Sequence, residues 1–217
     1  TELERREAVK SRTEAELKNL RNQLNPHFLL NTLNNIYALT AFDTEKAQQA
    51  IQELSKLLRY VLYDNQETFV PLTKEVEFIQ NYIELMRIRV SSAVKINTNF
   101  QIRPDSQSPV APLLFISLIE NAFKHGISPT EPSFIDIMLT EKDDEIHCVI
   151  RNSNYPKNAM DKSGSGIGLE QVRKRLELLY AGRYEWHQQI SSNQKEYSSI
   201  LTIKIPDNNK KILPCCL

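Results

Sequence analysis

The alternation of apolar and polar positions divides the chain of 217 residues into a helical first part and a mixed second part. Residues 1–65 contain no glycine and one proline, Pro26, and their apolar positions recur at helical spacing. The stripe formed by Leu3, Leu17, Leu20 and Leu24 is weak and broken, which predicts a short, marginal coiled-coil lead-in. A second amphipathic helix follows, with Asp43 or Thr44 as its N-cap. Its stripe comprises Ala47, Ala50, Ile51, Leu54, Leu58, Val61 and Leu62.

Two helices joined by a short turn form a helical hairpin, which buries little apolar surface by itself. We therefore expect residues 1–65 of two chains to pair as a four-helix bundle, which makes the protein a homodimer. The domain that follows is expected at residues 66–217.

Residues 66–217 mix helical periodicity with strict alternation. Helices are predicted at 73–90, where Thr73 follows Pro71 as N-cap, at 110–126, where Gly126 ends a buried run, and at about 169–180. Alternation predicts strands at 94–102, 134–141, 145–152, 183–192 and 197–205, with a hairpin across 142–144. Helices mixed with antiparallel strands define an α+β sandwich.

Composition excludes several classes of protein. Lys plus Arg equals 27 and Asp plus Glu equals 27, and this neutral balance argues against a nucleic-acid binder. The three cysteines, Cys148 and the pair Cys215–Cys216, show no zinc spacing and no disulfide framework, which fits a reducing compartment. The tail PCCL is not a prenylation signal, because Pro214 stands where the cysteine is required.

No apolar run approaches the ~18 residues that a membrane-spanning helix needs. The chain begins with Thr1 in the middle of a charged helical pattern. We therefore expect an excised fragment, the cytoplasmic portion of an inner-membrane bacterial sensor protein, with any contact to the membrane made by a missing N-terminal part.

The segment NQLNPHFLLNTLNNI places a proline and a histidine inside a helical pattern. His27, Asn31 and Asn34 share one stripe of that helix. The apolar stripe moves around the helix at Pro26, which predicts a kink there and an outward-facing His27. By itself this pattern also fits a surface histidine without a role.

The segment LIENAFKHG ends a buried helix with four polar side chains. Glu120 and Lys124, like Asn121 and His125, are four residues apart. A carboxylate, an amide, an ammonium and an imidazole at one helix end can hold a hydrated Mg²⁺ and phosphate oxygens. A helix end that is simply solvated is the alternative.

Three of the five glycines, Gly164, Gly166 and Gly168, occur in SGSGIGLEQVRKRL just before a helix. Closely spaced glycines let the backbone approach a ligand, and free N–H groups at a helix start bind phosphate. The surrounding pattern excludes a Rossmann fingerprint and a Walker P-loop. A flexible loop is the alternative reading.

Together the segments NPHFLLN, RY with YIEL…IR, ENAFKHG and GSGIGLEQVRKRL resemble the LytS-like family of bacterial sensor histidine kinases. The resemblance spans about residues 20–205. It implies a dimerisation and phosphoacceptor hairpin joined to a GHKL-type ATP-binding domain. The expected function is Mg·ATP-dependent autophosphorylation, followed by phosphoryl transfer to an aspartate of a response-regulator receiver domain.

The resemblance also implies roles for individual residues. His27 matches the phosphoacceptor and Asn121 the Mg²⁺ ligand. Glu120, Lys124 and His125 match positions around the phosphates. Gly164, Gly166 and Gly168 match the glycine box of the ATP lid. Arg59 matches a position to which we assign no role.

Asn152 departs from the wider superfamily, which has an aspartate there that accepts a hydrogen bond from adenine. An Asn oxygen can accept this bond and its NH₂ group cannot, so the orientation of the amide decides the outcome. In the mechanism that we expect, Glu120 orients the imidazole of His27 or accepts its proton, and Asn31 orients the ring or contacts the partner. Two other functions remain open: a superfamily ATPase or phosphatase without phosphohistidine, and a non-catalytic dimerisation scaffold.

Overall fold

The computed structural model describes residues 26–64, 67–155 and 167–205. Its contacts cluster into two compact units, residues 1–51 and 52–217, and each is described by itself. The boundary predicted between residues 65 and 66 stays a prediction. The predicted coiled-coil stripe at Leu3, Leu17, Leu20 and Leu24 lies outside the described residues, as do Gly164, Gly166 and the cysteines at the tail.

Two helices and a π-helix form the first described segment. Helix α2 spans Pro26–Thr40, α3 spans Thr44–Arg59, and the π-helix η1 continues the chain over Tyr60–Asp64. The backbone N–H of Lys46 donates to Asp43 Oδ1 at 3.0 Å, so the prediction of an N-cap at Asp43 is confirmed. Helix α3 begins in the first unit and ends in the second.

Helices α2 and α3 leave part of their apolar surface exposed. In α2, Thr32, Ile36 and Leu39 are buried. In α3, the buried apolar residues are Ala47, Ala50, Leu54 and Leu57. The exposed large apolar residues of α2, α3, η1 and the α2–α3 turn are Leu30, Leu33, Tyr37, Phe42, Ile51, Leu62 and Tyr63. Two positions of the predicted stripe, Ile51 and Leu62, are thus exposed.

The second unit is built on a five-stranded sheet with strand order β2-β4-β5-β7-β6. Strands β2 and β4 are parallel and the other pairs are antiparallel, so the sheet is mixed. A two-stranded sheet joins β1, Val70–Pro71, to β3, Pro109–Val110. The five strands are β2 Val94–Gln101, β4 Ser133–Lys142, β5 Glu145–Ser153, β6 Tyr184–Ile190 and β7 Glu196–Lys204. The predicted α+β class with a mixed sheet is confirmed.

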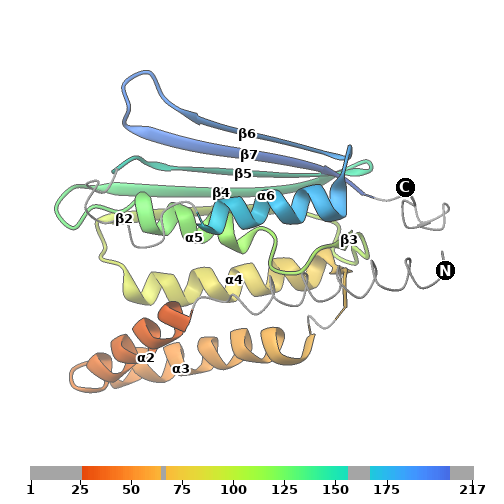
Figure 1. Ribbon diagram of the computed structural model, residues 1–217. Coiled ribbons are helices and arrows are strands. Elements are labelled where there is room, and N and C mark those ends of the chain that lie inside the picture. Colours follow the sequence, from red (N-terminus) through yellow and green to blue (C-terminus); the bar gives the residue numbers. More distant parts are fainter. Residues whose placement is uncertain (1–25, 65–66, 156–166, 206–217) are drawn as a thin grey trace. The chain divides into compact units, whose positions relative to one another are not determined.

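Helices α4, Leu72–Arg89, α5, Ile116–His125, and α6, Ile167–Tyr180, lie on one face of this sheet (Figure 1). The alternation of each strand explains the arrangement, since every second side chain points to the helices. The helix-facing rows of β4, β5 and β7 are buried and comprise Ile135, Ile137, Leu139, Ile146, Cys148, Ile150, Leu201 and Ile203. The opposite face is open, and Met138 and Ile200 are exposed there.

Two predicted helix starts are wrong. Pro71, and not Thr73, is the N-cap of α4, and the hydroxyl of Thr73 donates instead to the carbonyl of Ser106 at 3.2 Å. The helix predicted over 110–126 begins only at Ile116. Its first residues form β3 and a turn, because Pro112 has no N–H group and Leu113 adopts a left-handed φ of 60°.

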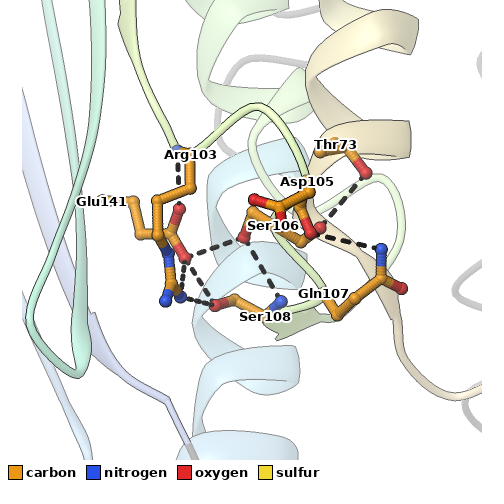
Figure 2. Close-up of polar contacts among 7 residues, drawn as sticks. All are labelled: Thr73, Arg103, Asp105, Ser106, Gln107, Ser108 and Glu141. Carbon is orange, nitrogen blue, oxygen red and sulfur yellow. Dashed lines mark hydrogen bonds and ion pairs between the residues drawn. The ribbon is translucent and has the colours of Figure 1, made fainter.

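A buried carboxylate at the end of β4 holds the loop between β2 and β3 (Figure 2). The Glu141 side chain is 1% exposed. Its Oε1 accepts hydrogen bonds from Arg103 Nη2 at 2.7 Å, from Ser106 Oγ at 2.7 Å and from Ser108 Oγ at 2.6 Å, and its Oε2 accepts from the Arg103 N–H at 3.0 Å. Burial works against ionisation, but these donors outweigh it and lower the pKa of Glu141 to about 2.

Glu141→Gln should destabilise the second unit by about 1.5–3 kcal/mol at neutral pH, because the hydroxyl and guanidinium donors lose a charged acceptor. The folded pKa lies below the ordinary value of 4.5, so this stabilisation is complete above pH 4.5 and is lost as the pH falls toward about 2. Urea unfolding of both proteins between pH 7 and pH 2.5 measures the difference. A difference that does not shrink over this range would contradict the assignment.

Candidate functional site

The polar residues of ENAFKHG lie on the last turns of α5. The buried stripe of this helix is Ile116, Leu118, Ile119, Ala122 and Phe123. The remaining positions are Ser117 near the start of the helix and Glu120, Asn121, Lys124 and His125 in its last turns. Glu120, Asn121 and His125 are half-buried and Lys124 is exposed, so the set lies at the edge of the core and not in free solvent.

The carboxyl group of Glu120 is held in apolar surroundings. Its Oε1 is buried and has no hydrogen-bond partner among the residues that the structure describes. Burial raises the pKa of Glu120 to about 7. Tyr82 of α4 lies near it and packs edge-on against Phe123 with ring centroids 6.0 Å apart. Burial, and then the charge of Glu120, raise the pKa of Tyr82 well above its ordinary value.

Asn152 presents an oriented hydrogen-bond acceptor at the end of β5. The residue is buried, and its Nδ2 donates to the carbonyl of Ser153 at 2.7 Å. This bond fixes the amide, so Oδ1 is the atom left to accept. Within the described part of the chain, the buried Oδ1 has no partner. This leaves Oδ1 as the available acceptor of the amide, and the expectation that it accepts a hydrogen bond from adenine stays a prediction.

Gly126 brings the end of α5 against Asn152. A Cβ at position 126 would lie 2.5 Å from the carbonyl oxygen of Ala122, 2.8 Å from Asn152 Cβ and 2.9 Å from Asn152 Nδ2. The carbonyl of His125 also accepts a hydrogen bond from the N–H of Tyr155 at 3.0 Å, just after β5. The sequence predicts only that Gly126 ends the helix. Its close approach to Asn152 cannot be seen there, because the two residues are 26 positions apart.

Gly126→Ala should therefore lower both stability and the affinity for any ligand that Asn152 holds. We expect a loss of about 1–3 kcal/mol, since the nearest atom is backbone and cannot turn away. Gly168→Ala is the matched control for stability only, because an added Cβ there meets nothing within 4 Å and alanine favours a helix, whereas the backbone of Gly168 is itself expected to bind phosphate. Thermal melting of both variants checks the prediction, and equal melting temperatures would refute it.

The remaining predicted residues fall in α2 and α6. His27 and Asn31 are four residues apart in α2 and share a stripe; Asn31 is half-buried and Asn34 is exposed. The predicted kink at Pro26 depends on residues that lie outside the described part. Gly168 is an exposed residue of the first turn of α6. Arg59, the last residue of α3, is exposed.

The described residues contain no group of three or more His, Cys, Asp or Glu side chains that would bind a metal ion without other ligands. A Mg²⁺ ion commonly takes one or two protein oxygens and completes its shell with water and phosphate. The amide oxygen of Asn121, at the polar end of α5, fits this kind of site. None of the described helices is long and apolar enough to cross a membrane.

Comparison with known proteins gives consistent matches. Residues 15–94 match the family described as histidine kinase. The chain is 30% identical to the sensor protein LytS of Oceanobacillus iheyensis over 97% of its own length and 38% of the relative's. It is 31% identical to the sensor histidine kinase YpdA of Escherichia coli K12, over 76% of its length and 31% of the relative's. The chain thus spans about a third of the length of these relatives.

Among solved structures, the histidine kinase domain of the blue-light activated kinase EL346 of Erythrobacter litoralis is similar over 90% of this chain and 93% of that one, with 12% identity and a TM-score of 0.47. The sequence matches define the class: the chain belongs to the sensor histidine kinases, since it is 30% identical to one sensor protein over 97% of its length and residues 15–94 match the histidine kinase family. Within that class, the predicted resemblance to the LytS-like sensor kinases is confirmed by the similarity over nearly the whole chain.

Proposed function

We propose that this chain is the kinase part of a sensor histidine kinase, which uses Mg·ATP to phosphorylate His27. The observation that carries the proposal is the buried Oδ1 of Asn152, an oriented acceptor without a partner among the described residues, beside the polar end of α5. Relatives named as sensor histidine kinases support the same activity.

The nucleotide would be held by groups of the second unit. Asn152 Oδ1 accepts from the adenine amino group, a donor that guanine does not carry at the same position. Asn121 would hold the Mg²⁺ ion, which would supply positive charge near the phosphates. Lys124, His125 and the backbone of Gly164, Gly166 and Gly168 bind the phosphates.

In the proposed reaction, a neutral ring nitrogen of His27 forms a bond to the γ-phosphorus while the bond to the β–γ bridging oxygen breaks and ADP leaves. Asn31 orients the ring from one helical turn away. Glu120 orients the imidazole or accepts its proton. Phosphoryl transfer depends mainly on the positions of the reacting groups and on charge neutralisation. Asn31 and Glu120 therefore contribute mainly by holding the imidazole in place. The phosphohistidine then passes its phosphoryl group to an aspartate of a response-regulator receiver domain.

Incubation of the chain with γ-labelled ATP and Mg²⁺ tests this function. We expect label that is lost in acid, survives base, and maps to the peptide containing His27. Release of labelled phosphate with no label on protein would instead indicate an ATPase or a phosphatase. Absence of nucleotide binding would favour a dimerisation scaffold without catalysis.

The partner of α2 and α3 is, in our proposal, a second copy of this chain. The support is the exposed apolar set on these helices, which includes Leu33, Tyr37 and Ile51 and is unusual for a surface that stays in water. Two hairpins of this kind bury such surface as a four-helix bundle. Sedimentation equilibrium decides the proposal, because a mass of one chain at micromolar concentration is incompatible with it.

A further inference from the structure

A carboxylate in the interior of the second unit has no role in the site described above. Glu75 of α4 is fully buried. Its Oε2 accepts a hydrogen bond from the hydroxyl of Tyr60 at 2.8 Å and another from the N–H of Leu113 at 3.0 Å. Burial raises the pKa of Glu75, although these two donors and the charge of Arg175 act in the opposite direction.

Arg175 of α6 contacts the same backbone segment that Glu75 contacts. Its guanidinium donates to the carbonyls of Leu113 at 3.2 Å and of Pro112 at 2.5 Å. One turn later in α6, the hydroxyl of Tyr180 accepts the N–H of Ala111 at 2.8 Å. The backbone of residues 111–113 is therefore held by α4 and α6 together, with Leu113 in a left-handed conformation.

The side chains of this buried group, Tyr60, Glu75 and Arg175, come from three different helices. Tyr60 is the first residue of η1 and directly continues α3, the second helix of the hairpin that carries the histidine. Its ring stacks on Phe78 of α4 with centroids 4.7 Å apart, which fixes the direction of its hydroxyl. Arg175 belongs to the helix that directly follows the glycine segment.

Stability alone is a weak explanation for this arrangement. A buried charge costs several kcal/mol unless it is fully compensated, and apolar residues of similar size commonly stabilise a fold as well or better. Directional bonds between distant elements, in contrast, define one position of each element relative to the others. A π-helix, the form that η1 takes, is also common at functional sites.

We propose that Glu75, Tyr60 and Arg175 are positioning residues that couple the end of α3 to α6. Through Glu75 and the backbone of residues 111–113, the position of η1 determines the position of α6, which carries Gly168 in its first turn. The inference rests on the proposed kinase function. Its consequence is that the hydroxyl of Tyr60 influences phosphoryl transfer through its hydrogen bond to Glu75.

Tyr60→Phe tests the coupling with the loss of one hydroxyl group. We expect the rate of phosphorylation at saturating ATP to fall about 3- to 30-fold, the usual range for residues that carry coupling, while ATP affinity stays within about 2-fold. Glu75→Gln should act alike, and Arg175→Lys should retain more activity than Arg175→Met. Tyr63→Phe is the matched control, since Tyr63 lies in the same π-helix and is 73% exposed.

Amide hydrogen exchange tests the coupling through the binding of Mg·ATP alone and does not require phosphoryl transfer. In the wild-type chain, Mg·ATP should slow exchange of the η1 amides as well as those of α5 and α6. In Glu75→Gln, protection of α5 and α6 should remain while protection of η1 disappears. Tyr60→Phe is the mildest change, so it keeps the test valid if Glu75→Gln fails to fold.

The coupling is refuted if Tyr60→Phe and Glu75→Gln phosphorylate at the wild-type rate, if their losses simply follow reduced ATP affinity, or if nucleotide leaves η1 exchange unchanged. Failure of the kinase function looks different. A wild-type chain that binds Mg·ATP but forms no acid-labile phosphate would end the proposed function, and the exchange measurement would still decide the coupling. A chain that binds no nucleotide would refute both.

Discussion

His27→Gln should abolish the acid-labile phosphate, at least ~100-fold below wild type, while leaving Mg·ATP affinity within about 2-fold. A glutamine amide has no nucleophilic lone pair comparable to that of a neutral imidazole, so the P–N bond cannot form. The nucleotide contacts proposed for Asn152 and Asn121 are unaffected. Quantified γ-label on the protein, with fluorescence titration of nucleotide, gives both numbers.

The matched control is His187→Gln. His187 is on β6, far along the chain from the proposed site residues, and its side chain is 75% exposed. We expect this variant to be labelled like the wild type. Persistent acid-labile label in His27→Gln would mean that another group accepts the phosphoryl, and the assignment of His27 would be wrong.

Asn152→Leu should weaken ATP binding by roughly 100-fold or more, since the site would lose the oriented acceptor for the adenine amino group. The preference for ATP over GTP should vanish with it. Asn152→Asp is the control that keeps an acceptor oxygen, and we expect it to retain most of the affinity and the preference. Isothermal titration with both nucleotides measures these effects.

Leucine has the same branched arrangement of four side-chain heavy atoms as asparagine, although its methyl groups are larger, and circular dichroism checks that the variant folds. If Asn152→Leu folds and still binds ATP like the wild type, adenine is not held at Asn152. If Asp and Leu weaken binding equally, the defect comes from the lost bond to Ser153 and not from the acceptor.

Elements set by local periodicity were predictable from the sequence. In the five-stranded sheet most core-facing positions, every second residue of a strand, are apolar, and the observed ends of each strand lie within two residues of the expected ones. The same reasoning failed for residues 110–115, where a continuous apolar run suggested a helix. There the conformation depends on Glu75, 38 residues earlier, and on Arg175, about 62 residues later, and no local pattern contains such partners.

For the candidate site, too, some features could be predicted from the sequence and others could not. The residue types of ENAFKHG could be identified in the sequence, because one helix turn brings them together. The orientation of the Asn152 amide could not, since it follows from a hydrogen bond to a carbonyl that only the folded strand presents. The close approach of Gly126 to Asn152 likewise depends on how α5 meets β5.

An amide at position 152 has no ionisation step near neutral pH, unlike the carboxylate found there in the wider superfamily. A carboxylate buried to the same degree would take up a proton as its surroundings acidify, and would then offer a donor where an acceptor is needed. Asn152 keeps the same hydrogen-bonding character at every pH at which the domain stays folded. It also places no net charge at the end of β5, where Asn152 is buried.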